Sequence, residues 1–499
     1  MDISKDPKSN RNLYVCITAV FLCLILFYLP SVGGKFGYLN DYTIFEYNPH
    51  QCCLGFPETI QLFAIGRPIQ ALLLNWQLMF VNGIDSLQPM RIFFVMMICF
   101  AATGFFVHIQ RHFNISRYSA AVLSLLIFTL PSMTINSFWV AQSIPGIVPI
   151  FFVLLAHSIM QIRGAMYIRC ICFATAFFLI YISLFIYPPA TFFFLTLTLI
   201  KFMFGAKDVH QTRLCNIHIE IVLLLTSCLV YFLTVKYILK PILITSHFGG
   251  MNFSSIFHDI DVKNTAYRFS VSFDPVDKIA RFYDLFRLIF SIWFPPLGLG
   301  FIIPIMAVFW STLAYASLDS PYLKNLNRTY RIIFGLSLAT FILLLSPLPV
   351  IIGQGNYPML YRVTFAPMAI IAVAIVFIMD RVFQMTNIGR KKYAFLCIIG
   401  IFILAGETSS YKRLVLMERR LSAEYSHVFN VVKKADDAGF KEIKILPIES
   451  PPDPRGFLFR DFGYTAVNSI TLGMVNAALQ ELGRDETQYH VRYDPLGQR

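Results

Sequence analysis

Long apolar runs separated by short polar connections fill most of the chain. Runs of about 18 or more apolar residues recur, and a helix of that length crosses about 30 Å of hydrocarbon. The pattern predicts an all-α polytopic membrane protein with about 11 transmembrane helices. The predicted spans lie near residues 13–32, 92–109, 118–137, 146–162, 169–187, 189–205, 219–238, 297–317, 332–352, 366–380 and 393–411.

The connections between these runs alternate in charge. The short connections on the same side of the membrane as the N-terminus carry Lys and Arg residues, whereas the opposite short connections at 142–146 and 187–189 carry none. Because cytoplasmic loops are enriched in Lys and Arg, the alternation predicts a cytoplasmic N-terminus and a C-terminus on the outer side. A signal peptide is the competing interpretation of the first run, but no small-x-small cleavage site follows it before Lys35, so we expect an uncleaved span.

Composition supports a membrane protein and argues against nucleic-acid binding. The chain of 499 residues is 57% hydrophobic and 14% charged, with a mean hydropathy of +0.63. Its net charge of +13 comes from scattered residues in short loops rather than from a basic patch. The 10 cysteines show no CxxC or Cys/His spacing, so no metal site is expected.

Three larger segments are predicted to face outward: loops at about 33–90 and 240–294, and the C-terminal region 412–499. In the first loop, Ile69, Leu72, Leu73 and Trp76 repeat with helical spacing after Pro68, which is typical of a helix at the membrane interface. The sequence of the C-terminal region predicts a small α+β appendage that follows a transmembrane domain spanning 1–411. Its expected elements are a helix at 423–438, a strand at 442–447, a helix at 466–482 and a strand at 489–493.

The candidate chemistry lies just after the first span, in the stretch GGKFGYLNDYTIFEYNPHQCCLGFPE. It contains the carboxylates Asp41 and Glu46 and the basic residue Lys35, and Arg67 follows in the same loop. A charged surface turn is the simpler interpretation. A second outward connection carries Arg362 where neighbouring outward turns have no positive charge, which either a phosphate or snorkelling to lipid headgroups would explain.

These residues suit sugar transfer from a lipid-linked phosphate donor. Such a reaction needs a carboxylate to take the proton of the attacking hydroxyl, and cations to stabilise the departing phosphate. Asp41 is the candidate base, Arg67 and Arg362 are the candidate cations, and Lys35 is a weaker one. The chain has no GxGxxG, P-loop or GxSxG motif, so a nucleotide-linked donor is not indicated.

At this point the sequence resembles a known family. The layout is similar to the GT-C superfamily of polytopic glycosyltransferases, and LNDYTIFEY followed by AIGRPIQALL resembles the Gtr-type serotype-converting O-antigen glucosyltransferases. The match in residues covers 40–46, 66–67 and, more loosely, Tyr361 and Arg362.

The resemblance implies transfer of a sugar, usually glucose, from a polyprenyl-phosphate donor to O-antigen units of lipopolysaccharide. Transfer would take place on the periplasmic face of the bacterial inner membrane. It implies Asp41 as base and Arg67, Tyr361 and Arg362 as substrate-binding residues. Asn40 stands where many GT-C enzymes have a second acid, so Glu46 would have to supply that acid, and no metal or other cofactor is expected.

Two other functions remain open at this stage. A transporter or flippase of lipid-linked oligosaccharide would place ionisable residues within the membrane, whereas the predicted spans here look almost free of charge. A non-catalytic envelope scaffold would use the charged C-terminal region to bind partners.

Overall fold

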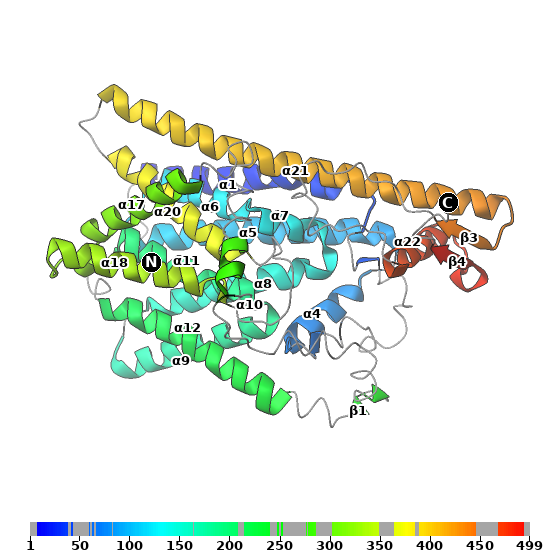
Figure 1. Cartoon of the computed structure of the whole chain (residues 1–499), viewed down its shortest axis with the longest axis horizontal. Helices are drawn as coiled ribbons and strands as arrows, with labels where there is room; N and C mark the ends of the chain where they lie inside the picture. The colour runs from blue at the N-terminus through cyan, green and yellow to red at the C-terminus, as the bar shows by residue number, and fades with distance from the viewer. Residues whose placement is uncertain are drawn as a thin grey trace.

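The structure is a computed structural model. It describes residues 7–37, 41–42, 59, 62–63, 66–81, 83–162, 164–207, 214–239, 247–248, 251–252, 276, 278–285, 302–348, 364–384, 389–445 and 468–493. The described part is a helical bundle with two small pairs of strands (Figure 1).

The helices of the bundle follow the apolar runs closely. In chain order they are α1 (Pro7–Gly33), α4 (Pro68–Leu78), the 3-10 turn η3 (Ile84–Ser86), α5 (Leu87–His112), α6 (Arg117–Phe128), α7 (Pro131–Phe138), α8 (Val140–Met160), α9 (Met166–Ile186), α10 (Pro188–Thr191), α11 (Phe193–Phe204), α12 (Leu214–Thr234) with the π-helical η5 (Val235–Leu239), α17 (Ile302–Asp319), the 3-10 turn η7 (Pro321–Leu323), α18 (Arg328–Leu345) and α20 (Phe365–Gln384).

Among the described residues, seven helices are long and apolar enough to cross a membrane, or eight if the pair α6 and α7, bent by 52°, forms one span. The bend falls at Pro131, whose ring disrupts a continuous helical ladder. The other predicted spans fall on α10 and α11, on α17 and on the first part of α21. The prediction of a multi-pass membrane protein is therefore confirmed, whereas the number of eleven spans stays a prediction.

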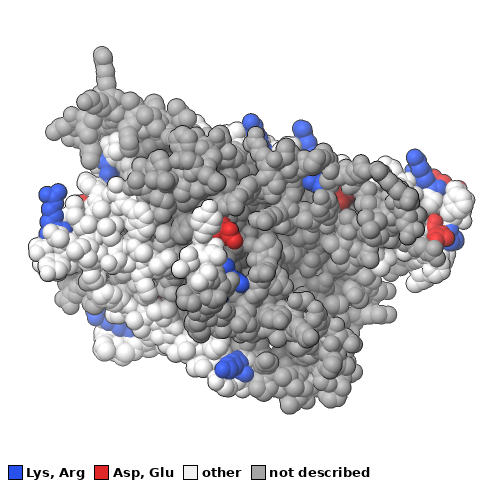
Figure 2. All heavy atoms as spheres, viewed as in Figure 1, with Lys and Arg blue, Asp and Glu red and all other residues white. Residues whose placement is uncertain are grey.

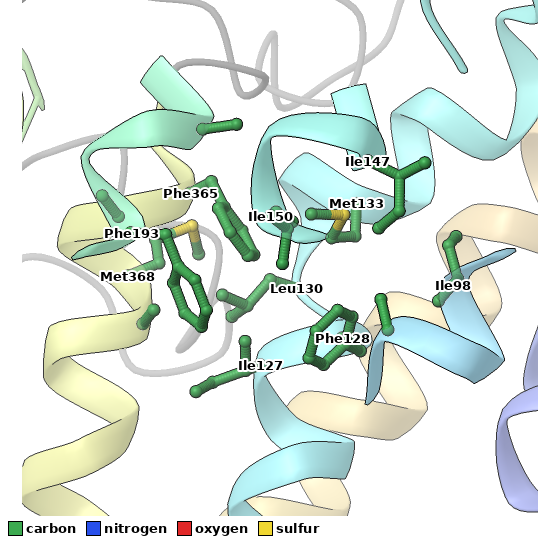
Figure 3. Close-up of a cluster of buried hydrophobic side chains, with 14 of the residues drawn as sticks. Ile98, Ile127, Phe128, Leu130, Met133, Ile147, Ile150, Phe193, Phe365 and Met368 are labelled. Carbon is green, nitrogen blue, oxygen red and sulfur yellow. The ribbon is translucent and has the colours of Figure 1, made fainter. Parts of the chain in front are cut away.

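The middle of the bundle is tightly packed and apolar. Helix α5 packs against α1, α6 and α8, and α11 packs against α20 with all its residues buried. Figure 3 shows side chains from six helices and the turn after α6 meeting in this layer: Ile98, Ile127, Phe128, Leu130, Met133, Ile147, Ile150, Phe193, Phe365 and Met368.

The predicted cytoplasmic connections meet at one end of the bundle. Phe113 pairs with Ala206 in an isolated bridge, and the Lys207 N–H donates to the His112 carbonyl at 2.9 Å. The Asp380 carboxylate accepts the N–H of Ser116, which caps α6. These contacts place Arg111, Arg117, Lys207 and Arg381 near one another along the chain ends of α5, α6, α11 and α20.

The C-terminal region begins with one very long helix. Helix α21 (Gly389–Asp437) runs beside α1, extends past the bundle and has α22 (Asn468–Glu481), β3 (Glu442–Ile445) and β4 (His490–Tyr493) below its far end (Figure 1). The 3-10 turn η9 (Glu486–Gln488) precedes β4. β3 and β4 are parallel, with Glu442 opposite His490, so α22 is their crossover helix.

The secondary structure predicted for this region is confirmed at all four elements, although its first helix is the end of α21 rather than a separate unit. The helix runs without a break through residues 411 and 412, where the sequence predicts a domain boundary. On the face in Figure 2, charged side chains of both signs gather at the end formed by α21 and the β3–β4 sheet. At the end of α21, Arg484 and Asp436 form an ion pair at 2.8 Å.

The second outer segment contributes one further pair of strands. β1 (His247–Phe248) and β2 (Met251–Asn252) are antiparallel and two residues long. Most of the predicted loop 240–294 lies outside the described residues.

Candidate functional site

Asp41 is buried at the N-terminus of a helix. Its side chain is fully enclosed, and Oδ2 accepts the N–H of Val140 at 3.1 Å. Val140 is the first residue of α8, and the preceding Trp139 provides no side-chain cap. The first N–H groups of a helix lack partners within the helix and favour a negative charge. Asp41 therefore supplies from a distant part of the chain the cap that α8 lacks locally.

Helix α4 crosses beside this carboxylate. The Gln77 side-chain amide donates to the Val140 carbonyl and to Ser143 Oγ, the latter at 3.0 Å. Gln77 is itself fully buried, and its Oε1 has no hydrogen-bond partner among the described residues. The hydroxyl of Ser132, on α7, is likewise buried without a partner there. Buried polar atoms are almost always paired, so the unsatisfied Gln77 oxygen beside the helix end that Asp41 caps calls for an explanation.

The orientation of α4 is the reverse of that of an ordinary surface helix. Its polar residues Gln70, Asn75 and Gln77 are buried, whereas Leu72 and Trp76 of the apolar stripe are 53% and 45% exposed. An apolar stripe facing outward is stable only against lipid, so the prediction of an interfacial helix agrees with the burial pattern. The polar face of α4 is turned toward the bundle and Asp41.

A buried arginine, which sequence reasoning missed, completes this region. The Arg91 guanidinium in α5 donates to the carbonyls of Phe36 at 2.6 Å and Gly34 at 2.5 Å, and lies 3.9 Å from the centre of the Phe36 ring. It interacts electrostatically with Asp41 and with Glu418 of α21. Its sequence position could have revealed it, because Arg91 lies near the outer end of a predicted span, where the positive-inside rule expects no Arg. The same reasoning had singled out Arg362.

The C-terminal region closes over the loop that carries Asp41. Gly473 of α22 approaches the backbone of Tyr42 so closely that a larger residue there would clash. The Tyr42 ring stacks on Tyr425 of α21 with centroids 6.3 Å apart, and its hydroxyl accepts the Gly37 N–H at 2.8 Å. Burial raises the pKa of both Tyr42 and Tyr425 well above the ordinary value, so both remain neutral donors at physiological pH.

Lys35 forms the polar link in this closure. Its Nζ lies 2.8 Å from the Asp85 carboxylate and 2.7 Å from that of Glu481, which also accepts the Tyr425 hydroxyl at 2.9 Å. The hydrogen bonds to Asp85 and Glu481 raise the pKa of Lys35. Lys35 thus joins the loop to η3 and to α22.

Arg67 lies at the opposite end of α4 from Gln77. It is the N-cap residue of α4, its Nη1 donates to Gln70 at 3.4 Å, and its guanidinium lies 5.3 Å from the centre of the Tyr187 ring. Ten residues of helix separate Arg67 from Gln77, roughly 15 Å along the axis. Asp41 and Arg67 therefore lie near the two ends of one interfacial helix. Glu46, Tyr361 and Arg362 lie outside the described residues.

The spans are not free of charge, contrary to the impression given by the sequence. Lys201 of α11 and Glu220 of α12 form a buried ion pair at 2.5 Å, and His108 and His157 lie beside it. These residues come from four different helices, so their association emerges only from the packing of the helices. Among the described residues, no group of three or more His, Cys, Asp or Glu side chains could hold a metal ion.

Fold and site together define a multi-pass helical membrane protein with a buried carboxylate beneath an interfacial helix at one end. Comparison with protein-family models and with curated proteins found no match to this chain.

Proposed function

We propose that this chain is a membrane glycosyltransferase of the GT-C type. The observation that carries the proposal is the inward-facing polar side of α4, which meets Asp41 at the N-terminus of α8. A sugar presents many hydroxyls, and the unpaired oxygen of Gln77 is an acceptor that such a hydroxyl would satisfy. The outward apolar stripe of α4 suits contact with the polyprenyl chain of a donor held in the bilayer.

In the proposed reaction, the acceptor hydroxyl attacks the anomeric carbon of the donor while Asp41 takes its proton. The bond between the anomeric carbon and the phosphate oxygen breaks, and its electron pair leaves with the phosphate. Arg67, at the N-terminus of α4, is the proposed cation for this phosphate, because a cation and a helix N-terminus both favour an anion. The role requires the long Arg67 side chain to extend along α4 toward the end where Asp41 lies. Glu46, Tyr361 and Arg362 retain their proposed roles as second acid and substrate-binding residues.

The proposed donor is polyprenyl-phosphate glucose and the proposed acceptor is O-antigen on lipopolysaccharide, with Asp41 on the periplasmic side of the bacterial inner membrane. The gathering of Arg111, Arg117, Lys207 and Arg381 at the opposite end of the bundle supports this orientation. The N-terminus would then be cytoplasmic and the C-terminal region periplasmic.

The test is transfer of radiolabelled glucose from polyprenyl-phosphate glucose to lipopolysaccharide in membranes that contain wild type or Asp41→Asn. The asparagine can still accept the Val140 N–H but cannot take a proton, so transfer should fall by about 10²-fold or more with the helix cap intact. Asp437→Asn is the matched control, because Asp437 is an exposed carboxylate at the end of α21. Normal transfer by Asp41→Asn would exclude Asp41 as the base.

A transporter of lipid-linked oligosaccharide is the second candidate, and the buried Lys201–Glu220 pair favours it. Ionisable residues inside a membrane bundle often mark proton or substrate pathways. An enzyme retains its transfer activity in detergent, where no sealed compartment exists. Transport cannot be measured there, because it requires a membrane that separates two compartments. Transfer measured in detergent therefore separates the two candidates, and a non-catalytic scaffold would show neither activity.

A further inference from the structure

A continuous row of hydrogen-bonding side chains runs from a half-buried serine to a fully buried carboxylate. Ser158 Oγ lies 2.8 Å from His108 Nδ1, and His108 Nε2 lies 3.0 Å from His157 Nδ1. His157 Nε2 faces Glu220 Oε1 at 3.7 Å, and Glu220 is paired with Lys201. The row crosses α8, α5, α8 again and α12, at the end of the bundle opposite Asp41.

The surroundings isolate this row from water except at its serine end. His108, His157, Lys201 and Glu220 are all buried, and the rings of Phe113 and Phe194 pack edge-on against His157 with centroids 5.8 and 5.7 Å away. Both His157 Nε2 and Glu220 Oε2 lack a hydrogen-bond partner within the described residues. The other titratable or charged groups that act on the row are Arg111, His112 and Tyr322, and Lys207 acts on His112.

The row has two complete hydrogen-bond arrangements. In the first, the Ser158 hydroxyl donates to His108 Nδ1, His108 Nε2–H donates to His157 Nδ1, and His157 Nε2–H points at the Glu220 carboxylate. In the second, every ring proton has moved to the other nitrogen and Glu220 carries a proton that it directs at His157 Nε2. The Ser158 hydroxyl can serve both, because it also lies 2.8 Å from the Leu154 carbonyl and can donate there instead.

We propose that Ser158, His108, His157 and Glu220 form a proton-transfer chain that loads one proton onto Glu220. The two arrangements differ by that single proton. A proton from water binds Ser158 Oγ as the O–H bond that faced His108 breaks and an N–H bond forms at His108 Nδ1. The Nε2–H bond of His108 breaks as one forms at His157 Nδ1, and the Nε2–H bond of His157 breaks as an O–H bond forms on Glu220. The last step requires His157 and Glu220 to approach from 3.7 Å to hydrogen-bond distance, a tightening that catalytic hydrogen bonds commonly undergo.

Loading the proton has a structural consequence. The Lys201–Glu220 pair joins α11 to α12, and it is an ion pair only while Glu220 is charged. A protonated Glu220 leaves the Lys201 ammonium without its counter-ion in a buried position, so the contact between the two helices weakens. The chain therefore couples one proton to the packing of α11 against α12, whether the protein is an enzyme or a transporter.

The first test detects the proton on Glu220. Infrared difference spectra of the full chain in lipid nanodiscs are compared between about pH 8 and about pH 3, because the Lys201 ammonium stabilises the charged form of Glu220 and its protonation therefore needs a low pH. Wild type should show the band of a protonated carboxyl group. Glu220→Gln combined with Lys201→Met should lack it, without leaving a buried charge unpaired. Asp380→Asn, which changes another buried carboxylate at this end, should keep it.

The second test asks whether the proton travels through the histidines. After a rapid drop in pH, His157→Phe should slow the appearance of the Glu220 band by about 10²-fold, the lower end of what a positioned acid–base group contributes. If His157→Phe does not fold, His157→Gln serves instead. Glutamine is polar but cannot pass a proton on, so it should slow the appearance of the band by the same factor. His218→Phe is the control, since His218 is exposed on the same helix as Glu220.

Two results would overturn the proposal. If folded wild type shows no carboxyl band, or the double variant shows the same one, Glu220 is a permanent ion-pair partner. If the band rises equally fast without His157, Glu220 takes its proton directly from water.

Discussion

Arg91 offers the sharpest test of how the loop that carries Asp41 is held. Its guanidinium makes charge-assisted hydrogen bonds to the buried carbonyls of Phe36 and Gly34. Each hydrogen bond to a charged group is worth about 1.5–3 kcal/mol, so replacing Arg91 with methionine should release the loop by about 3–6 kcal/mol. Methionine fills a similar volume, and the loss therefore reports the missing bonds rather than a cavity.

The Gly37 amide is the natural probe, because it donates to the Tyr42 hydroxyl only while the loop is closed. A loss of 3 kcal/mol corresponds to about a 10²-fold increase in exchange, since about 1.4 kcal/mol is tenfold. Amide hydrogen exchange followed by mass spectrometry should therefore show Gly37 exchanging at least that much faster in Arg91→Met. Arg91→Lys should fall between, because an ammonium cannot reach both carbonyls in the fork geometry of a guanidinium.

Arg111→Met is the control, since Arg111 is exposed at the other end of the same helix. It removes a positive charge from α5 without touching the loop, and Gly37 should exchange as in wild type. If Arg91→Met also exchanges as in wild type, the guanidinium does not hold the loop closed.

Two further predictions concern stability. Because the folded pKa of Lys35 is raised by Asp85 and Glu481, its ion pairs stabilise the fold below about pH 10.4 and are lost at higher pH. Above that pH, the thermal midpoint in detergent should fall more steeply in wild type than in Lys35→Met. For such half-exposed groups, the free energy of unfolding that is lost is about 1 kcal/mol or less. Gly66→Ala should cost about 1–2 kcal/mol because Gly66 has φ +77° and lies against Val235, whereas Gly104→Ala, with open space around it, should be neutral or stabilising; equal midpoints for these two would contradict the structure.

Elements set by local sequence were predictable. Apolar run length located the spans, and the Pro68 start with its apolar repeat located α4. The predicted helix at 423–438 is confirmed, but it is continuous with the preceding span in α21 rather than separate from it. The sequence becomes charged after Gly406, yet no Gly or Pro occurs from 407 to 437 to end the helix. The change in composition indicated that the chain leaves the apolar layer. Only a helix-breaking residue would have indicated that the helix ends there.

The pairing of polar residues was not predictable, because it depends on distances between helices. Asp41 could be singled out from its loop, but its partner Val140 lies 99 positions away and contributes a backbone N–H, which no motif encodes. Glu220 and His157 each look like one tolerated polar residue in an apolar run. Their significance comes from the packing of α8 against α11 and of α11 against α12.

The two polar clusters lie at opposite ends of the same two helices, α5 and α8, and are separated by the same number of residues on each. Seventeen residues separate Arg91 from His108 on α5, and seventeen separate Val140 from His157 on α8, which is roughly 25 Å of helix in both cases. That length approaches the thickness of the hydrocarbon layer, and the apolar side chains of Figure 3 fill the interval. A proton cannot cross such a layer without donors and acceptors along the way. The proton that Asp41 would take from an acceptor must therefore return to water on its own side, and Glu220 must be loaded from the other.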